Sequence, residues 1–228
     1  MPGYQDTGIE VQGGGAVILV FWHDAANRGG REVDMARTRS GEYEDKRQHI
    51  LTQAAALFAE HGFAGTSMVA LAARCGVSKP LLYHYYASKE ALLFDLIEAY
   101  IAHFAATVIE AAETPGNPEY RLRQSVRSLM EICIADRDRH ITMLNELQLL
   151  PPALQAPLIA AQRRVVAAIG DMVLAINPAF AATKIPLAFS LLGSINWAYR
   201  WFHAEGGMTP RAYADLACDV FLSGVRPS

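Results

Sequence analysis

The stretch Val77–Leu93, VSKPLLYHYYASKEALL, places three tyrosines and a histidine between two lysines. Lys79 and Lys89 each follow a serine, a residue type that caps helix starts. A helix N-terminus has about half a positive charge, so a lysine there is slightly unfavourable unless an anion binds beside it. Duplex DNA presents phosphate anions in rows. The stretch therefore predicts a surface that contacts a nucleic acid backbone and base edges.

The elements that must position these side chains are two short helices. Caps and apolar spacing predict one helix over MVALAARC, a turn at Gly76, and a second helix from Lys79 to about Tyr86. This arrangement is a helix-turn-helix, whose second helix enters the major groove of DNA. Residues four apart on that helix share a face, so Lys79 lies beside Tyr83 and Pro80 beside His84. Leu82 belongs to the opposite, packing face.

Nine residues are predicted to contact DNA. Those expected to bind the backbone are Thr66, Ser67, Tyr83, His84 and Lys89, while Lys79, Pro80 and Leu81 are expected near base edges and Ser78 caps the helix. Each residue alone is more often a solvated charge or a core side chain. The combination of cap, lysine, aromatic row, second cap and second lysine within so short a stretch favours DNA contact. Tyr85 and Tyr86 are assigned mainly to packing.

Residues 46–93 resemble the DNA-binding head of the TetR/AcrR family of bacterial transcriptional regulators. The matching segment is ILTQAAALFAEHGFAGTSMVALAARCGVSKPLLYHYYASKEALL, from Ile50 to Leu93. Pro80 and Leu81 stand where the family often has Gly or Ala followed by Thr or Ser, and Tyr86 replaces the usual Phe. The resemblance implies an all-helical homodimer with a divergent C-terminal ligand domain, usually a repressor that a small molecule releases from a palindromic DNA operator.

The predicted fold is all-α, with an N-terminal three-helix helix-turn-helix head and a larger helical body. Residues 1–42 are expected to be a disordered tail, 43–90 the DNA-binding domain, and 91–228 the ligand-binding and dimerisation domain. Helical periodicity and breaks such as TPGNP predict a long fourth helix over about 89–113. Met35 is a candidate initiator. The further helices are expected at about 118–136, 138–149, 152–176, 181–203 and 209–224.

The body offers only weak signals for a ligand site. The segment 185–203 is apolar on nearly every face and must be buried on more than one side, either in the monomer core or in a dimer. Residues 191–225 are similar to regulators that respond to acyl-CoA thioesters, and Arg163, Arg164 and Arg200 could serve an acidic ligand. The candidate pocket residues, whose types are each more often found in a plain core, are Tyr100, Phe104, Met130, Ile134, Met143, Leu147, Phe189 and Trp197.

Composition excludes several other classes. The chain has 228 residues and a net charge of −3, but residues 35–90 carry seven Lys/Arg against five Asp/Glu, a net +2. Three distant cysteines argue against a disulfide framework and a zinc site and favour a cytoplasmic protein. No uninterrupted apolar run approaches the roughly 18 residues of a membrane span. We find no motif for an enzyme or a cofactor; the alternative is a helical protein-interaction module that does not bind DNA.

Overall fold

A computed structural model describes residues 32–203 and 206–227, and all regular secondary structure in these ranges is helical. The all-α prediction is therefore confirmed. The chain divides into two units, residues 1–42 and 43–228, and the second contains the helix-turn-helix and the body. Most of the predicted tail, including residues 1–31, lies outside the described residues.

The first helix begins earlier than predicted. Helix α1 spans Glu32–Gly65, so residues 32–42 are helical although the sequence pattern assigned them to a disordered tail. The segment has no apolar periodicity, but its two Glu, two Arg and one Ala favour helix, and it contains no proline. Gly62 interrupts the helix with φ 72°, a left-handed conformation that glycine adopts readily.

The head contains the two short helices that the caps predicted. Helix α2 spans Met68–Arg74 and helix α3 spans Lys79–Tyr85. The Ser67 hydroxyl accepts a hydrogen bond from the Ala70 amide, and the Ser78 hydroxyl accepts one from the Leu81 amide. Gly76 forms the turn at φ 64°, a left-handed conformation that glycine adopts without strain.

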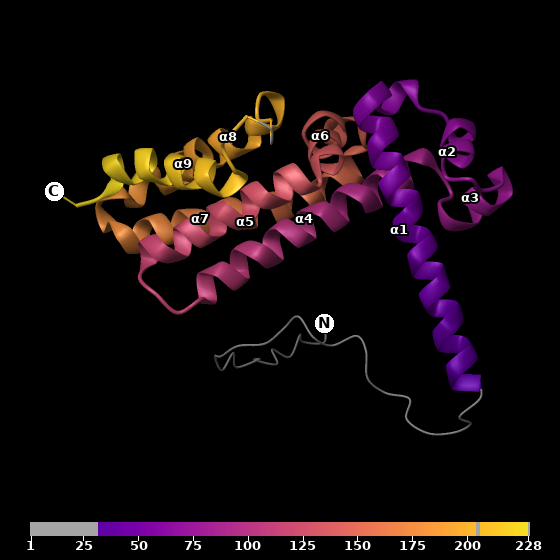
Figure 1. Cartoon of the computed structure of the whole chain (residues 1–228), viewed down its shortest axis with the longest axis horizontal. Helices are drawn as coiled ribbons and strands as arrows, with labels where there is room; N and C mark the ends of the chain where they lie inside the picture. The colour runs from indigo at the N-terminus through magenta and orange to yellow at the C-terminus, as the bar shows by residue number, and fades with distance from the viewer. Residues whose placement is uncertain (1–31, 204–205, 228) are drawn as a thin grey trace, which may run out of the picture. The chain divides into compact units, whose positions relative to one another are not determined.

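The body is a bundle of longer helices. Helix α4 (Lys89–Glu113) packs against α5 (Pro118–Ala135) and α7 (Pro152–Ile176), α9 (Pro210–Val225) lies on α5, and α8 (Lys184–Asn196) lies on α7 (Figure 1). The short α6 (Arg137–Glu146) contacts α4 and α5. One-turn 3₁₀ segments Leu147–Leu149 and Ala198–Arg200, and the longer Pro178–Thr183, connect the helices.

Helix α8 is shorter than predicted and one of its faces is unburied. The helix ends at Asn196, and the chain then turns so that Tyr199 and Phe202 point into the core. The row Ile185, Phe189 and Trp197 is exposed, with Phe189 58% and Trp197 61% accessible. The sequence pattern predicted that segment 185–203 is buried on more than one side. Within one chain, the face with Ile185, Phe189 and Trp197 is not buried.

Two segments, Lys89–Glu113 and Pro178–Arg200, are long and apolar enough to cross a membrane by length and composition alone. In the structure α4 packs with α5, α6 and α7. Its apolar residues Leu92, Leu96 and Ile97 are completely buried. The apolar character of α4 is therefore accounted for by the core of the bundle.

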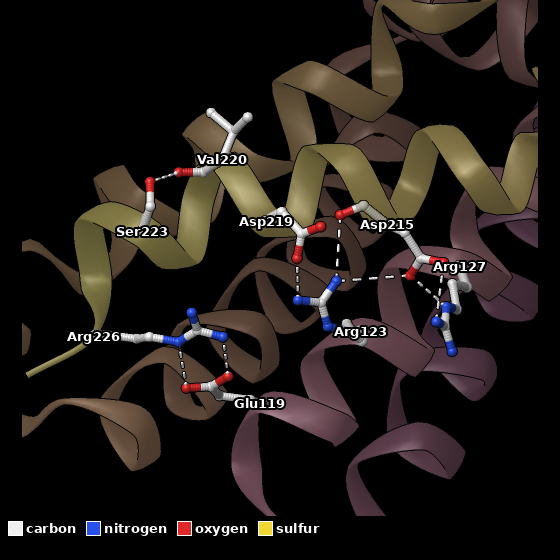
Figure 2. Close-up of polar contacts among 8 residues, drawn as sticks. All are labelled: Glu119, Arg123, Arg127, Asp215, Asp219, Val220, Ser223 and Arg226. Carbon is white, nitrogen blue, oxygen red and sulfur yellow. Dashed lines mark hydrogen bonds and ion pairs between the residues drawn. The ribbon is translucent and has the colours of Figure 1, made fainter.

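An ionic ladder attaches α9 to α5. Arg127 donates two hydrogen bonds to Asp215, of 2.6 and 3.0 Å, Arg123 pairs with Asp219, and Arg226 donates two to Glu119 (Figure 2). These hydrogen bonds lower the pKa of the Asp215 and Glu119 carboxyls. Val220, also labelled in Figure 2, points away from the arginines. With α9 held in this orientation, Leu216 and Val220 are exposed, whereas Ala214, Cys218 and Leu222 are buried in the core.

Candidate nucleic-acid interface and ligand cavity

Helix α3 has a buried back and an exposed polar front. Leu82 is completely buried, and Tyr86, which follows the helix, is 5% exposed. On the opposite side Lys79, Pro80 and His84 are exposed, and Tyr83 is 43% accessible. The Lys79 ammonium lies 5.8 Å from the centre of the Tyr83 ring. An ammonium, a phenol and an imidazole therefore share one free surface at the start of a helix.

Seven of the nine predicted DNA-contact residues lie at or near this surface. Ser67 and Ser78 are exposed caps of α2 and α3, and Leu81 is half-buried beside Pro80. Tyr85 is half-buried and stacks on Tyr43 at 4.6 Å, in agreement with its assignment to packing. The face defined by Ser78, Lys79, Pro80, Tyr83 and His84 is called the recognition face below.

The other two residues, Thr66 and Lys89, point inward. Thr66 is 3% exposed, and its hydroxyl donates to the Gly62 carbonyl at 2.9 Å rather than facing outward as expected. The Lys89 ammonium donates to the carbonyls of Phe63 and Thr66 at 2.6 and 2.7 Å and lies 4.2 Å from the Phe63 ring centre. The lysine at the start of α4 is therefore balanced by carbonyl oxygens within the head, which the sequence reasoning missed.

We expect Lys89→Ala to destabilise the head. The change leaves two partly buried carbonyls without a donor, which should cost about 1–3 kcal/mol and lower Tm by several degrees. The measurement is thermal unfolding followed by circular dichroism. Lys79→Ala is the matched control, because Lys79 is exposed and should change stability by less than about 0.5 kcal/mol. An unchanged Tm together with weaker DNA binding would instead support the prediction that Lys89 contacts the DNA backbone.

A carboxylate that the sequence analysis overlooked fixes the recognition helix to α4. Asp95 accepts hydrogen bonds from Arg47 on α1, at 3.1 Å from Nε, and from the phenol of Tyr86 at the end of α3. Burial, then the hydrogen bond to Asp95, raises the pKa of Tyr86, so the phenol keeps its proton and remains the donor. Asp95 thereby joins α1, α3 and α4 at one point. Sequence spacing gives no sign of this contact, because the partners are 48 and 9 residues away.

The body contains a cavity of about 300 Å³ between α4, α6, α7 and α8. Such a volume lies at the low end of small-molecule sites. The lining is mainly aliphatic and aromatic, and its polar side chains come from Gln162, Arg163 and Asn196. The residues around it are Ile101, Phe104, Met143, Ile159, Gln162, Arg163, Val165, Val166, Phe189, Leu192, Gly193 and Asn196.

Three of the eight predicted pocket residues, Phe104, Met143 and Phe189, line this cavity. The others fill different places. Tyr100 and Met130 are core residues, with 2% and 0% exposure, and Trp197 points outward beneath the Arg200 guanidinium. Ile134 and Leu147 are half-buried and pack on the core. Phe189, Leu192, Gly193 and Asn196 share one face of α8, as helical periodicity predicts. Periodicity does not show that this face borders a cavity.

A buried histidine lies directly behind the cavity wall. His140 on α6 is completely buried; its Nδ1 is 3.0 Å from the Tyr100 hydroxyl and its Nε2 is 3.3 Å from the Asn196 carbonyl oxygen. Its ring also stacks on Phe104. Burial lowers the pKa of His140, which favours the neutral ring. The histidine therefore connects α4, α6 and the end of α8 through polar contacts beside the cavity.

The short α2, the glycine turn and the exposed α3 define a helix-turn-helix protein with a separate helical body. Comparison with known proteins gives the family. Residues 50–96 match "Bacterial regulatory proteins, tetR family", and residues 115–225 match "Tetracyclin repressor-like, C-terminal domain". Together the two matches cover the head and nearly all of the body. The chain belongs to the TetR family, which confirms the resemblance of the Ile50–Leu93 segment.

Solved structures of this family are similar over most of the chain. A TetR-family transcriptional regulator from Bordetella parapertussis 12822 is 35% identical, with a TM-score of 0.74, over 77% of this chain and 93% of that one. AibR, solved in complex with isovaleryl coenzyme A and operator DNA, is 28% identical, with a TM-score of 0.67, over 77% and 97%.

Curated relatives match over shorter stretches. The transcriptional repressor KstR2 of Mycobacterium tuberculosis is 31% identical over 84 residues, which are 37% of this chain and 42% of KstR2. The chain spans about half the length of the curated relatives it matches. These matches add to the family assignment.

Proposed function

We propose that this chain is a DNA-binding transcriptional regulator that docks α3 in the major groove of an operator. The observation that supports this most directly is the recognition face: its polar side chains are free while Leu82 anchors the helix from behind. In a helix-turn-helix the N-terminal residues of the second helix contact base edges. Lys79 and Pro80 occupy those positions, and the exposed Tyr83, His84 and Ser67 are the proposed contacts to the DNA backbone.

The proposed division is a DNA-binding domain over residues 43–90 and a ligand-binding and dimerisation domain over 91–228. Lys89 and Asp95, near the start of α4, contact the head, whereas Ile101 and Phe104, further along α4, line the cavity. One helix thus reaches both proposed domains. Its position is suited to transmit a change from one to the other.

The proposed assembly is a homodimer formed through α8 and α9. Seven of the thirteen exposed large apolar side chains in the described residues fall between Ile185 and Val220. Leu216 and Val220 form a row on α9, and the α8 row ends at Trp197. Four such helices from two copies would cover both rows in an isologous interface. Two-fold symmetry would place two α3 helices in successive major grooves, about 34–36 Å apart, on a near-palindromic operator.

The proposed mode is repression relieved by a small molecule in the cytoplasm, with an acyl-CoA as the candidate effector. The apolar cavity supports a ligand, the complex of AibR with isovaleryl coenzyme A supports its class, and the repressor KstR2 supports the mode. Ligand would favour a conformation in which the heads no longer match the operator spacing. Two helices link the sites: α4, and α6, where Met143 lines the cavity and Thr142 contacts the Ala55 carbonyl on α1.

The test is a gel-shift titration of the full chain against the DNA upstream of its own gene. We expect a saturable complex. An unlabelled duplex that contains both halves of the palindrome should displace the labelled DNA, and a shuffled duplex should not. A complex that dissociates equally with both competitors would refute sequence-specific operator binding. No complex at all would refute the DNA-binding function and favour the interaction module. Release by octanoyl-CoA would support the proposed effector class.

A further inference from the structure

The cavity contains one unpaired cation at the edge of an otherwise apolar wall. Arg163 is the only ionisable side chain in its lining, and no carboxylate faces the space. Among the described residues Arg163 has no ion pair, whereas Arg123, Arg127 and Arg226 on nearby helices all pair with acids. Arg163 is exposed at the surface of α7, so it lies at the rim rather than at the floor.

The wall combines a few polar side chains with a mainly apolar lining. Gln162 and Arg163 lie together on α7, and Asn196 lies at the end of α8. Aliphatic and aromatic side chains such as Ile101, Phe104 and Val166 make the rest of the lining. Guanidinium groups bind carboxylates and phosphates with planar paired hydrogen bonds, supported here by an adjacent amide donor. The wall is thus complementary to a molecule with an apolar body and one anionic end.

We propose that the cavity binds an organic acid of compact apolar body and that Arg163 is the counter-ion for its anionic group. The inference deepens the proposed function and rests on the assignment of this cavity as the effector site. A free acid has its anion directly on the acyl chain, whereas a coenzyme A thioester has its anions on phosphates beyond a neutral thioester and the pantetheine arm. Arg163 at the rim could pair with either anion, and the experiment distinguishes the two sources. Neutral apolar molecules would fill the same space without using Arg163.

The chain contains a matched control for this residue. Arg164 is the next residue on α7, is also exposed, and does not line the cavity. Arg163→Gln and Arg164→Gln therefore remove the same charge from neighbouring positions, and glutamine keeps the helix and a hydrogen-bonding end. Any general effect of net charge on anion binding should be equal in the two variants.

The experiment is isothermal titration calorimetry of the full chain, without DNA, using octanoate, 1-octanol and octanoyl-CoA. We expect the wild type to bind octanoate at least about fivefold more tightly than octanol, because one charge-assisted hydrogen bond at a partly exposed rim contributes roughly 1 kcal/mol or more. In Arg163→Gln the octanoate affinity should fall by about the same factor, while octanol affinity stays constant. Arg164→Gln should resemble the wild type.

Several outcomes would overturn the inference: no preference of the wild type for the acid, equal losses in both variants, or no binding of any of the three probes. Tighter binding of octanoyl-CoA that also weakens in Arg163→Gln would support it and identify the coenzyme as the source of the anion. Because no DNA is present, the result is independent of the gel shift. A chain that binds its upstream DNA but does not discriminate octanoate refutes only the ligand class.

Discussion

Replacing Val220 by aspartate is expected to separate the proposed dimer into monomers and to lower operator affinity by about 100-fold or more. Val220 is 68% exposed, the highest value among the exposed large apolar side chains. In an isologous interface each substitution appears twice, so two carboxylates would be brought into a desolvated contact. A single head retains its own contacts but loses the gain in effective concentration that a second, linked head provides.

The measurement is sedimentation velocity for the mass and fluorescence anisotropy for DNA affinity. The matched control is Ile109→Asp, since Ile109 is also an exposed aliphatic residue, 46% accessible, but lies on α4 away from α8 and α9. We expect this variant to remain dimeric and to bind DNA as the wild type does. A Val220→Asp protein that still sediments as a dimer would show that another surface forms the interface.

Tyr83→Ala is expected to weaken operator binding by about tenfold or more without changing stability. Loss of one direct DNA contact typically costs about 1–3 kcal/mol of binding free energy. Tyr83 is 43% exposed, and its ring lies 5.8 Å from the Lys79 ammonium on the recognition face. Its removal therefore leaves no cavity inside the head and should not change Tm.

Tyr120→Ala is the control for this second change, because Tyr120 has almost the same exposure, 42%, and lies on α5 in the body. Anisotropy titrations of both variants against the same duplex give the comparison. Equal affinities for wild type and Tyr83→Ala would mean that α3 does not dock through the recognition face. Equal losses in the two tyrosine variants would point to a global effect on folding instead.

Local chemistry made the head predictable. Ser67, Ser78 and Ser88 cap three consecutive helices, and Gly76 supplies the turn. These interactions join residues within a few positions of each other, so their residue types and spacing are enough to identify them. The same holds for the exposed face of α3, because a seven-residue helix with one buried leucine has only one other side.

Long-range contacts were not predictable in this way. The sequence pattern indicated that Lys89 begins a helix, but its ammonium is satisfied by carbonyls 23 and 26 residues earlier. Asp95 likewise acts through Arg47, which is 48 residues away. The choice of partner depends on how α4 crosses α1, and helical period does not specify that crossing.

The sequence by itself determined an all-helical chain, the order of its helices in the body, and a helix-turn-helix whose polar face is free. Those features depend on caps, breaks and periodicity, all of which act over a few residues. Only the tertiary structure decided which apolar side chains fill the core, as Met130 does, which line a cavity, as Val166 does, and which remain exposed, as Val220 does. Burial favours all such side chains alike, and only the packing of α4, α7, α8 and α9 gives each one its place.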